Sequence, residues 1–205
     1  VGAFRRDFAD FFGSATVPAT AEFLELYDLN PNVYGQYPVV TQTNLDRTVR
    51  MQGLTFNYRQ PLTFLPAWAA GIGAFSNLTI QHLQGDTTAD FTGFVQRTIN
   101  WGVSLNRARF TGRVNVNLRG RERRAVFTGV GVEPGTYTYM APRKSMDASA
   151  EYRVTRTFAI YGTVRNLFNA PEDIEQYGPS TPYYARLATR TDYRPVYTVG
   201  LKATY

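Results

Sequence analysis

Tyr197-Thr-Val-Gly-Leu-Lys-Ala-Thr-Tyr205 is the final stretch of the chain, and its apolar residues fall on every second position. Strict alternation with a period of two is typical of a β-strand that has one apolar face and one polar face. Free termini of soluble domains tend to fray, whereas the last strand of a membrane barrel must pair with the first strand. A final strand that ends on an aromatic residue therefore favours a membrane barrel.

Composition excludes several classes of protein. The 205 residues include no cysteine, so disulfide frameworks and thiolate metal sites are excluded. No stretch approaches the ~20 consecutive apolar residues that a spanning helix needs. Aromatic residues make up 15% of the chain, and tyrosine favours the interface between membrane and water. The net charge is +6, but the arginines are dispersed except at 119–124, which we interpret as a solvated rim. Nucleic-acid binding is therefore not expected.

Alternating segments predict eight strands, at residues 1–6, 46–60, 71–84, 94–107, 110–123, 144–154 and 158–168, and from Tyr197 to the end. The fifth strand shows the pattern most clearly. One face carries Phe110, Gly112, Val114, Val116 and Leu118, and the other carries Thr111, Arg113, Asn115, Asn117 and Arg119.

The connections between these strands differ in length. Those after the fourth and sixth strands are minimal, at 107–109 and 155–157, while those after the first, fifth and seventh are long and polar. Short turns at one end and long loops at the other are typical of outer-membrane barrels. Several strands exceed the usual ~5–6 residues and reach the ~9–11 that a tilted spanning strand requires. The sequence thus predicts an all-β fold, a transmembrane antiparallel β-barrel.

Two motifs resemble those of the TonB-dependent outer-membrane receptors. The final stretch resembles the terminal assembly signal of outer-membrane barrels, on Thr198, Gly200, Leu201, Ala203 and Tyr205. The second motif resembles the end of the family's penultimate strand, and it comprises Asn166, Leu167, Phe168 and Asn169.

This resemblance implies a barrel of 22 strands around an N-terminal plug, with residues 1–205 forming the last eight strands of that single barrel domain. The plug is absent from these residues, and the chain is expected to be a fragment. The family's localisation is the outer membrane of Gram-negative bacteria. Its implied partners are outer-membrane lipid, the missing plug, the TonB complex and the barrel assembly machinery. The implied function is energised uptake of a scarce small-molecule nutrient, such as a siderophore, cobalamin or an oligosaccharide.

Neither catalysis nor a cofactor is predicted. His82 is the only histidine, and no serine or paired acid lies near it in the sequence. Because hydrolytic triads use histidine as a base, we interpret His82 as an interfacial or loop-edge residue. The acids Glu172, Asp173 and Glu175 are a weak signal for a metal, since calcium needs six or more oxygen ligands, and no metal site is predicted.

Loop aromatics and arginines are the candidates for ligand contact, because aromatic rings can stack on sugars or aromatic chelators. The candidates are Tyr27, Tyr34, Tyr37, Tyr137, Tyr139, Tyr177, Tyr183, Tyr184 and Arg186. Packing of loops or of an interfacial girdle is the competing interpretation of these residues.

Two alternatives to the receptor stay open. One is a complete, small eight-stranded outer-membrane barrel with a structural or adhesive role, whose interior would be filled by side chains. The other is a soluble β-sandwich that acts as a binding module.

Overall fold

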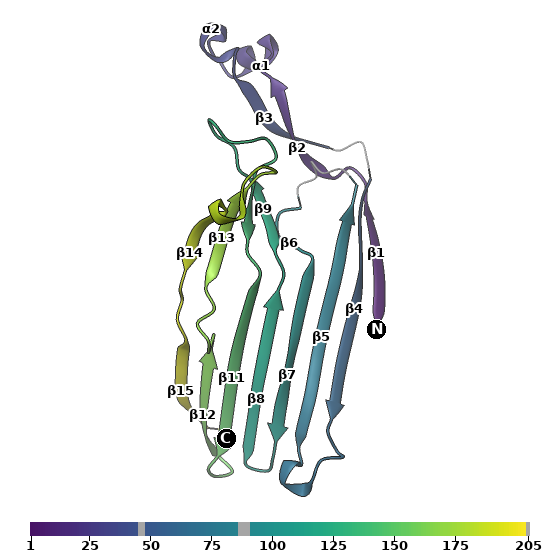
Figure 1. The fold of residues 1–205 in the computed structure, drawn as a ribbon, viewed down its shortest axis with the longest axis vertical. Helices are drawn as coiled ribbons and strands as arrows, with labels where there is room; N and C mark the ends of the chain where they lie inside the picture. The colour runs from purple at the N-terminus through teal and green to yellow at the C-terminus, as the bar shows by residue number, and fades with distance from the viewer. Residues whose placement is uncertain (45–47, 86–90, 204–205) are drawn as a thin grey trace. The chain divides into compact units, whose positions relative to one another are not determined.

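The structure, a computed structural model, describes residues 1–44, 48–85 and 91–203. It consists mostly of antiparallel sheets of eight, five and two strands (Figure 1). No helix among these described residues is both long enough and apolar enough to cross a membrane.

The largest sheet follows the order of the sequence from one edge to the other. Its order is β1-β4-β5-β7-β8-β11-β12-β15. The strands are β1 (Gly2–Phe8), β4 (Val49–Pro61), β5 (Ile72–Gln84), β7 (Arg97–Asn106), β8 (Phe110–Arg119), β11 (Arg143–Arg153), β12 (Phe158–Arg165) and β15 (Val196–Ala203). Each of the eight strands predicted from alternation has its counterpart here. The sheet is open, because β1 and β15 form its edges and no pairing among the described residues joins them.

The five-stranded sheet prolongs five strands of the larger sheet. It contains β6 (Phe94–Val95), β9 (Glu122–Val126), β10 (Tyr137–Met140), β13 (Glu172–Tyr177) and β14 (Leu187–Thr191). Its order, β14-β13-β10-β9-β6, repeats the order of β15, β12, β11, β8 and β7. The prediction of unbroken strands over 94–107 and 110–123 is therefore wrong, because they are interrupted at Gln96 and at 120–121, and the strand predicted over 158–168 ends at Arg165. Gly120 lies between β8 and β9, while Pro142, Pro171 and Pro195 lie between β10 and β11, between β12 and β13, and between β14 and β15. Proline cannot donate to a strand ladder.

The connection at residues 9–48 holds structure that alternation did not predict. Strands β2 (Phe12–Pro18) and β3 (Pro38–Asn44) pair, and α1 (Ala21–Leu26) and α2 (Pro31–Tyr34) lie between them in sequence. Both helices have side-chain caps, because Thr20 Oγ1 accepts from the Phe23 amide at 3.2 Å and Asn30 Oδ1 accepts from the Asn32 amide at 2.9 Å. Single turns of 3₁₀-helix, η1 (Ala67–Ala69) and η2 (Tyr183–Ala185), occur in two other connections.

The chain divides into two compact units. The first comprises Val1–Phe4, Gly53–Gln81 and Thr92–Tyr205, and the second comprises Arg5–Gln52 and His82–Phe91. The second unit contains a stack of Phe11 on Phe91, whose ring centroids lie 4.5 Å apart, with Phe8 edge-on to Phe11 at 5.6 Å. The surfaces described below belong to the first unit, in which Ala69, Val116, Met140 and Ala159 are the buried apolar residues.

Candidate functional surface and polar belt

One face of the large sheet is apolar and lies open. Val103, Val114, Ala148, Val164 and Tyr197 form one row, because each lies opposite the next across β7, β8, β11, β12 and β15. A second row runs parallel to it and consists of Phe110, Tyr152, Ile160 and Leu201. Leu201 is 78% exposed and Tyr197 is 70% exposed. Contiguous exposed apolar surface of this kind marks contact with a protein or a membrane.

The opposite face carries a ladder of polar side chains. Asn100 on β7 donates to Asn117 Oδ1 on β8, and Asn117 Nδ2 donates to Asp147 Oδ2 on β11 at 3.1 Å. The other carboxylate oxygen of Asp147 accepts from the Asn166 amide at 2.9 Å. The ladder thus connects three strands of the large sheet to the predicted motif at 166–169.

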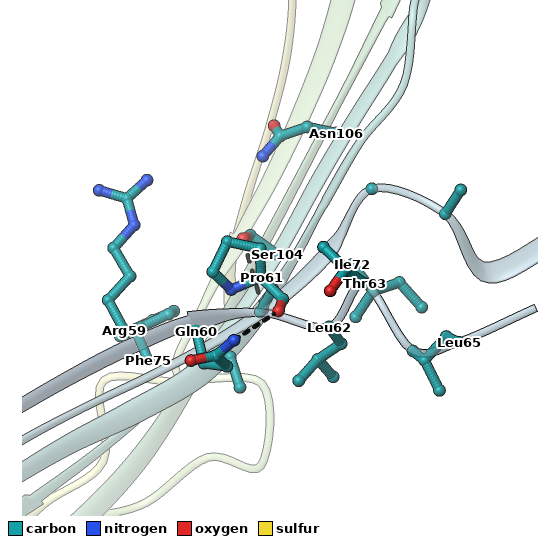
Figure 2. A pocket seen from close by; sticks show the side chains of 14 residues that line it. Arg59, Gln60, Pro61, Leu62, Thr63, Leu65, Ile72, Phe75, Ser104 and Asn106 are labelled. Atoms are coloured by element: carbon teal, nitrogen blue, oxygen red, sulfur yellow. Dashed lines mark hydrogen bonds between the residues drawn. The ribbon is translucent and has the colours of Figure 1, made fainter.

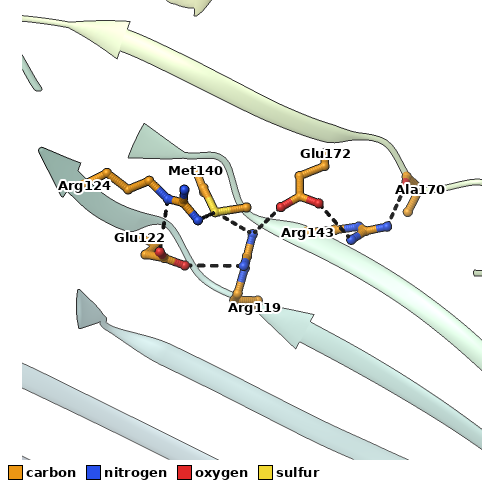
Figure 3. A network of polar contacts seen from close by, with 7 residues as sticks. All are labelled: Arg119, Glu122, Arg124, Met140, Arg143, Ala170 and Glu172. Carbon is orange, nitrogen blue, oxygen red and sulfur yellow. Dashed lines mark hydrogen bonds and ion pairs between the residues drawn. The ribbon is translucent and has the colours of Figure 1, made fainter. Parts of the chain in front are cut away.

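A polar belt lies on this face, where the two sheets meet (Figure 3). Arg119 contacts Glu122 at 3.3 Å and Glu172 at 3.7 Å, and Arg143 contacts Glu172 at 3.5 Å. Arg124 pairs with Glu122 at 3.2 Å and donates to the Sδ atom of Met140. Because Glu172 joins arginines from β8 and β11, the belt ties three strands together. Arg119 and Arg124 of the predicted solvated rim at 119–124 therefore take part in this ion-pair network.

The motif Asn166, Leu167, Phe168 and Asn169 forms the bend between β12 and β13. Asn166 has φ of 54° and Asn169 has φ of 51°, a left-handed conformation that asparagine tolerates better than most residues. The side chain of Asn166 accepts from the Ala170 amide at 2.8 Å and donates to the Ala170 carbonyl at 3.2 Å. Asn166 is buried, so its polar groups depend on these partners.

Four residues of the predicted terminal signal lie in β15, and Tyr205 lies outside the described residues. Thr198 is opposite Thr163, Gly200 is opposite Tyr161, Leu201 is opposite Ile160 and Ala203 is opposite Phe158. The Tyr161 ring lies across Gly200, since a Cβ built on Gly200 would be 2.5 Å from the Tyr161 Oη atom. The glycine of the motif therefore leaves space for a ring of the neighbouring strand.

The candidate ligand residues fall into separate places. Tyr137, Tyr139, Tyr177, Tyr183 and Arg186 gather on the five-stranded sheet and its adjoining connection, where the Tyr139 and Tyr177 rings stack at 4.3 Å. The Arg186 guanidinium lies 4.5 Å from the centroid of the Tyr177 ring and 5.8 Å from that of the Tyr183 ring. Tyr27, Tyr34 and Tyr37 belong to the second unit, and Tyr184 is exposed in η2. A role in ligand contact stays a prediction for all of them.

Two arginines of this cluster were interpreted from the sequence as part of the solvated rim at 119–124 and not as candidates for ligand contact. The Arg121 guanidinium lies 6.0 Å from the Tyr139 centroid and 5.5 Å from the Tyr177 centroid, and that of Arg123 lies 5.0 Å from the Tyr137 centroid. Their spacing of two residues was the available signal, since alternate residues of an extended chain point to the same side. Burial is the main cause that raises the pKa of Tyr139, so its hydroxyl stays protonated at neutral pH.

The three acids of the weak metal signal take arginine partners. Glu172 pairs with Arg119 and Arg143, and Glu175 pairs with Arg121 at 3.4 Å. Asp173 pairs with Arg190 at 2.6 Å, and hydrogen bonding to this guanidinium lowers the pKa of the Asp173 carboxyl. Within the described ranges, no group of three or more acidic or histidine side chains is placed to hold a metal.

A cavity of about 450 Å³ lies beside the connection between β4 and β5 (Figure 2). Its polar lining includes Arg59, Gln60, Ser104 and Asn106. Gln60 Nε2 donates to the Pro61 carbonyl at 2.9 Å, and Ser104 Oγ donates to the Gly73 carbonyl at 3.5 Å. The lining offers hydrogen-bonding groups but no pair of nucleophile and base. His82 lies near the end of β5, outside this cavity.

Comparisons with protein-family models, with curated proteins and with solved structures find no match for this chain. Its function must therefore be inferred from the arrangement of its own residues.

Proposed function

We propose that this chain is part of the wall of a transmembrane β-barrel in a Gram-negative outer membrane, in a receptor of the TonB-dependent type. The observation that carries the proposal is the exposed apolar face of a long-stranded antiparallel meander, which lies opposite a hydrogen-bonded polar face. A barrel wall needs this division because one face meets lipid and the other meets water or a plug.

The height of the apolar face fits a membrane. On β8 this face extends from Phe110 to Leu118, which at ~3.4 Å per residue is about 27 Å along the strand. A tilt of about 40° reduces this length to about 21 Å along the membrane normal, close to the ~25 Å apolar band of outer-membrane barrels. A single strand therefore carries the apolar face across most of a bilayer.

The lengths of the connections indicate which end of the sheet would face the periplasm. The turns after β7 and β11 take only residues 107–109 and 154–157, while those after β8 and β12 take residues 120–142 and 166–195. In an antiparallel meander, alternate connections lie at opposite ends of the sheet. The short turns would therefore face the periplasm, and the polar belt would lie on the inner face near the outer leaflet.

The open sheet favours a larger barrel over a complete eight-stranded one. A closed barrel of eight strands would pair β1 with β15, and the described residues include no such pairing. Further strands would then adjoin these edges, as the 22-stranded architecture provides. In this proposal the chain itself is wall and lumen lining. Energised uptake of a nutrient would depend on a plug and on the TonB complex.

Membrane insertion can be tested with the full-length protein in vesicles that contain brominated lipids. A Trp68→Phe background leaves Trp101 as the remaining tryptophan of residues 1–205, and subtracting the signal of a Trp68→Phe/Trp101→Phe variant isolates its fluorescence. Trp101 lies on the apolar face beside Val116. Deep bromines should quench Trp101 fluorescence. A protein that stays soluble without detergent and shows no quenching would refute the proposal.

The gene tests the choice between the two barrels. Coding sequence for a plug-like domain upstream of the Val1 codon is expected for the receptor. A signal peptide coded directly before Val1 would instead support the small barrel. Deleting Tyr205 should impair assembly in the outer membrane, as judged by loss of the heat-modifiable band, and an unaffected band would remove the terminal motif from the argument.

A further inference from the structure

The apolar face continues into a basic aromatic surface on the five-stranded sheet. We name it the arginine–tyrosine patch, and it consists of Arg121, Arg123, Tyr137, Tyr139, Tyr177 and Arg186. Register assigns Arg123 and the three tyrosines to one face, because Tyr139 lies opposite both Arg123 and Glu175, and Tyr137 lies opposite Tyr177. Arg121 and Arg186 contact the rings on that face.

The opposite face of the same sheet belongs to the polar belt. Met140 lies opposite Glu122 and Ile174, and Glu122 contacts Arg119, whose side chain is on the polar face of β8. A sheet has two faces, so the arginine–tyrosine patch lies on the side of the apolar face.

Lys144 marks the passage from the apolar face to the patch. Lys144 is on β11 and lies opposite Leu118 of β8, two residues along from the pair of Met146 and Val116. Its side chain is exposed. From the short-turn end toward the five-stranded sheet, the outward face thus runs from Phe110 and Tyr152 through small and aliphatic residues to Lys144. The arginines and tyrosines follow.

The charge of this surface is positive even after its internal ion pairs are counted. Arg121 pairs with Glu175, and Arg190 pairs with Asp173. The part of the chain that the structure describes provides no carboxylate partner for Arg186, whose Nε donates to the Thr181 carbonyl at 3.4 Å. Stacking on Tyr177 and Tyr183 holds the Arg186 guanidinium in place, and its charge can attract an anion.

We infer that the arginine–tyrosine patch binds the phosphate groups of anionic lipid headgroups in the leaflet next to the five-stranded sheet. This inference rests on the proposed function, since it requires the apolar face to lie in lipid. Guanidinium forms paired hydrogen bonds with phosphate. Tyrosine is favoured at a membrane interface, where its ring contacts apolar chains and its hydroxyl contacts headgroups or water. Continuity with the apolar face is what selects a lipid phosphate as the occupant.

The test uses the full-length protein in phosphatidylcholine nanodiscs with and without phosphatidic acid, and native mass spectrometry counts the retained phosphatidic acid. Each basic residue near an anionic membrane surface strengthens binding about fivefold. The double variant R121Q/R186Q should therefore retain phosphatidic acid about 25-fold more weakly than the wild type. R113Q is the matched control, because Arg113 lies on the polar face of β8, and it should bind as the wild type does.

Quenching of Trp101 by brominated lipids, measured on the same samples, separates the two proposals. Normal quenching with equal lipid retention in R121Q/R186Q and wild type would overturn the headgroup inference and leave the membrane wall standing. Absence of quenching in the wild type would overturn both. Inorganic phosphate should displace the lipid no better than chloride at equal ionic strength. Selective displacement would make the patch a site for soluble phosphate and would also overturn the inference.

Discussion

Val114→Arg is the substitution that tests the membrane-facing surface most directly. Val114 lies at the middle of the apolar face of β8, between Val103 on β7 and Ala148 on β11. It is four residues from both Phe110 and Leu118, so in a tilted strand it lies about 10 Å from either margin of the apolar face. A bilayer would therefore hold this side chain near its midplane.

An arginine at the midplane of an outer-membrane barrel costs about 2–4 kcal/mol, and one near the interface costs about 0–1 kcal/mol. We expect V114R to lower the free energy of unfolding by about 3 kcal/mol and L118R by less than about 1 kcal/mol. The assay is urea-driven unfolding of the full-length protein in phospholipid vesicles, followed by tryptophan fluorescence.

Thr163→Arg provides the control on the opposite face at the same depth. Thr163 lies opposite Ser149, which in turn lies opposite Arg113, the neighbour of Val114. A polar lumen should accept this arginine with little loss of stability. If V114R and T163R cost the same, both faces meet the same solvent and the division between lipid and lumen is wrong. An exposed site on a soluble protein would change by about 0.5 kcal/mol or less.

Three further predictions concern the bend, an ion pair and the final strand. N166G retains the left-handed backbone but loses the two side-chain hydrogen bonds, so it should destabilise the protein by about 1–3 kcal/mol in the same denaturation assay. N166A should cost more because it adds backbone strain, and equal values for the two variants would show that the backbone conformation is unimportant. Because the pKa of Asp173 is lowered, its pair with Arg190 stabilises the fold above the ordinary carboxyl pKa of ~3.9, and this contribution is lost as the pH falls below it. Hydrogen-exchange protection of β13 should therefore fall less in D173N than in the wild type on acidification below about pH 4. An unchanged acid dependence would exclude the pair as its cause. G200A should cost about 1–3 kcal/mol through overlap with Tyr161, and adding Y161A should recover part of this loss; a double variant no more stable than G200A would refute the contact.

The strands β7, β8, β11 and β15 could be predicted most clearly because each has a period of two over eight or more residues, whereas β1, β4 and β5 alternate less regularly. Alternation reports a difference between the surroundings of two faces, and on β8 that difference separates Val114 and Val116 from Asn115 and Asn117. The five-stranded sheet could not be predicted in this way. Its strands are short, and both of its faces carry charged residues. Apolar and polar residues therefore do not alternate along these strands, and the two faces differ only in which arginines contact tyrosines.

The small elements at 9–48 had local signals of another kind. Asn30 followed by Pro31 is a helix start, because asparagine caps the first turn and proline needs no amide donor there. The pairing of β2 with β3 had no such signal. Phe12 lies opposite Asn44, and the alternation of residue types along these two strands does not specify that register. The motif at 166–169 was correctly located, but sequence alone gave no sign that Asn166 supports a bend through Asp147 and Ala170.

The gradation of residues along the outward face bears on what covers it. A β-sandwich would need a second sheet over the apolar face, yet the five-stranded sheet prolongs the first sheet and leaves Tyr197 and Leu201 exposed. A second copy of the chain could also cover this face, but a protein interface has no requirement for an order along the strand. An outer membrane does favour an order, with girdles of aromatic rings at both interfaces of an apolar band. On β8 and β11 the face runs from Phe110 and Tyr152 through Val114 to Lys144, and the tyrosines of the arginine–tyrosine patch lie beyond it, which is the order that the proposed membrane wall requires.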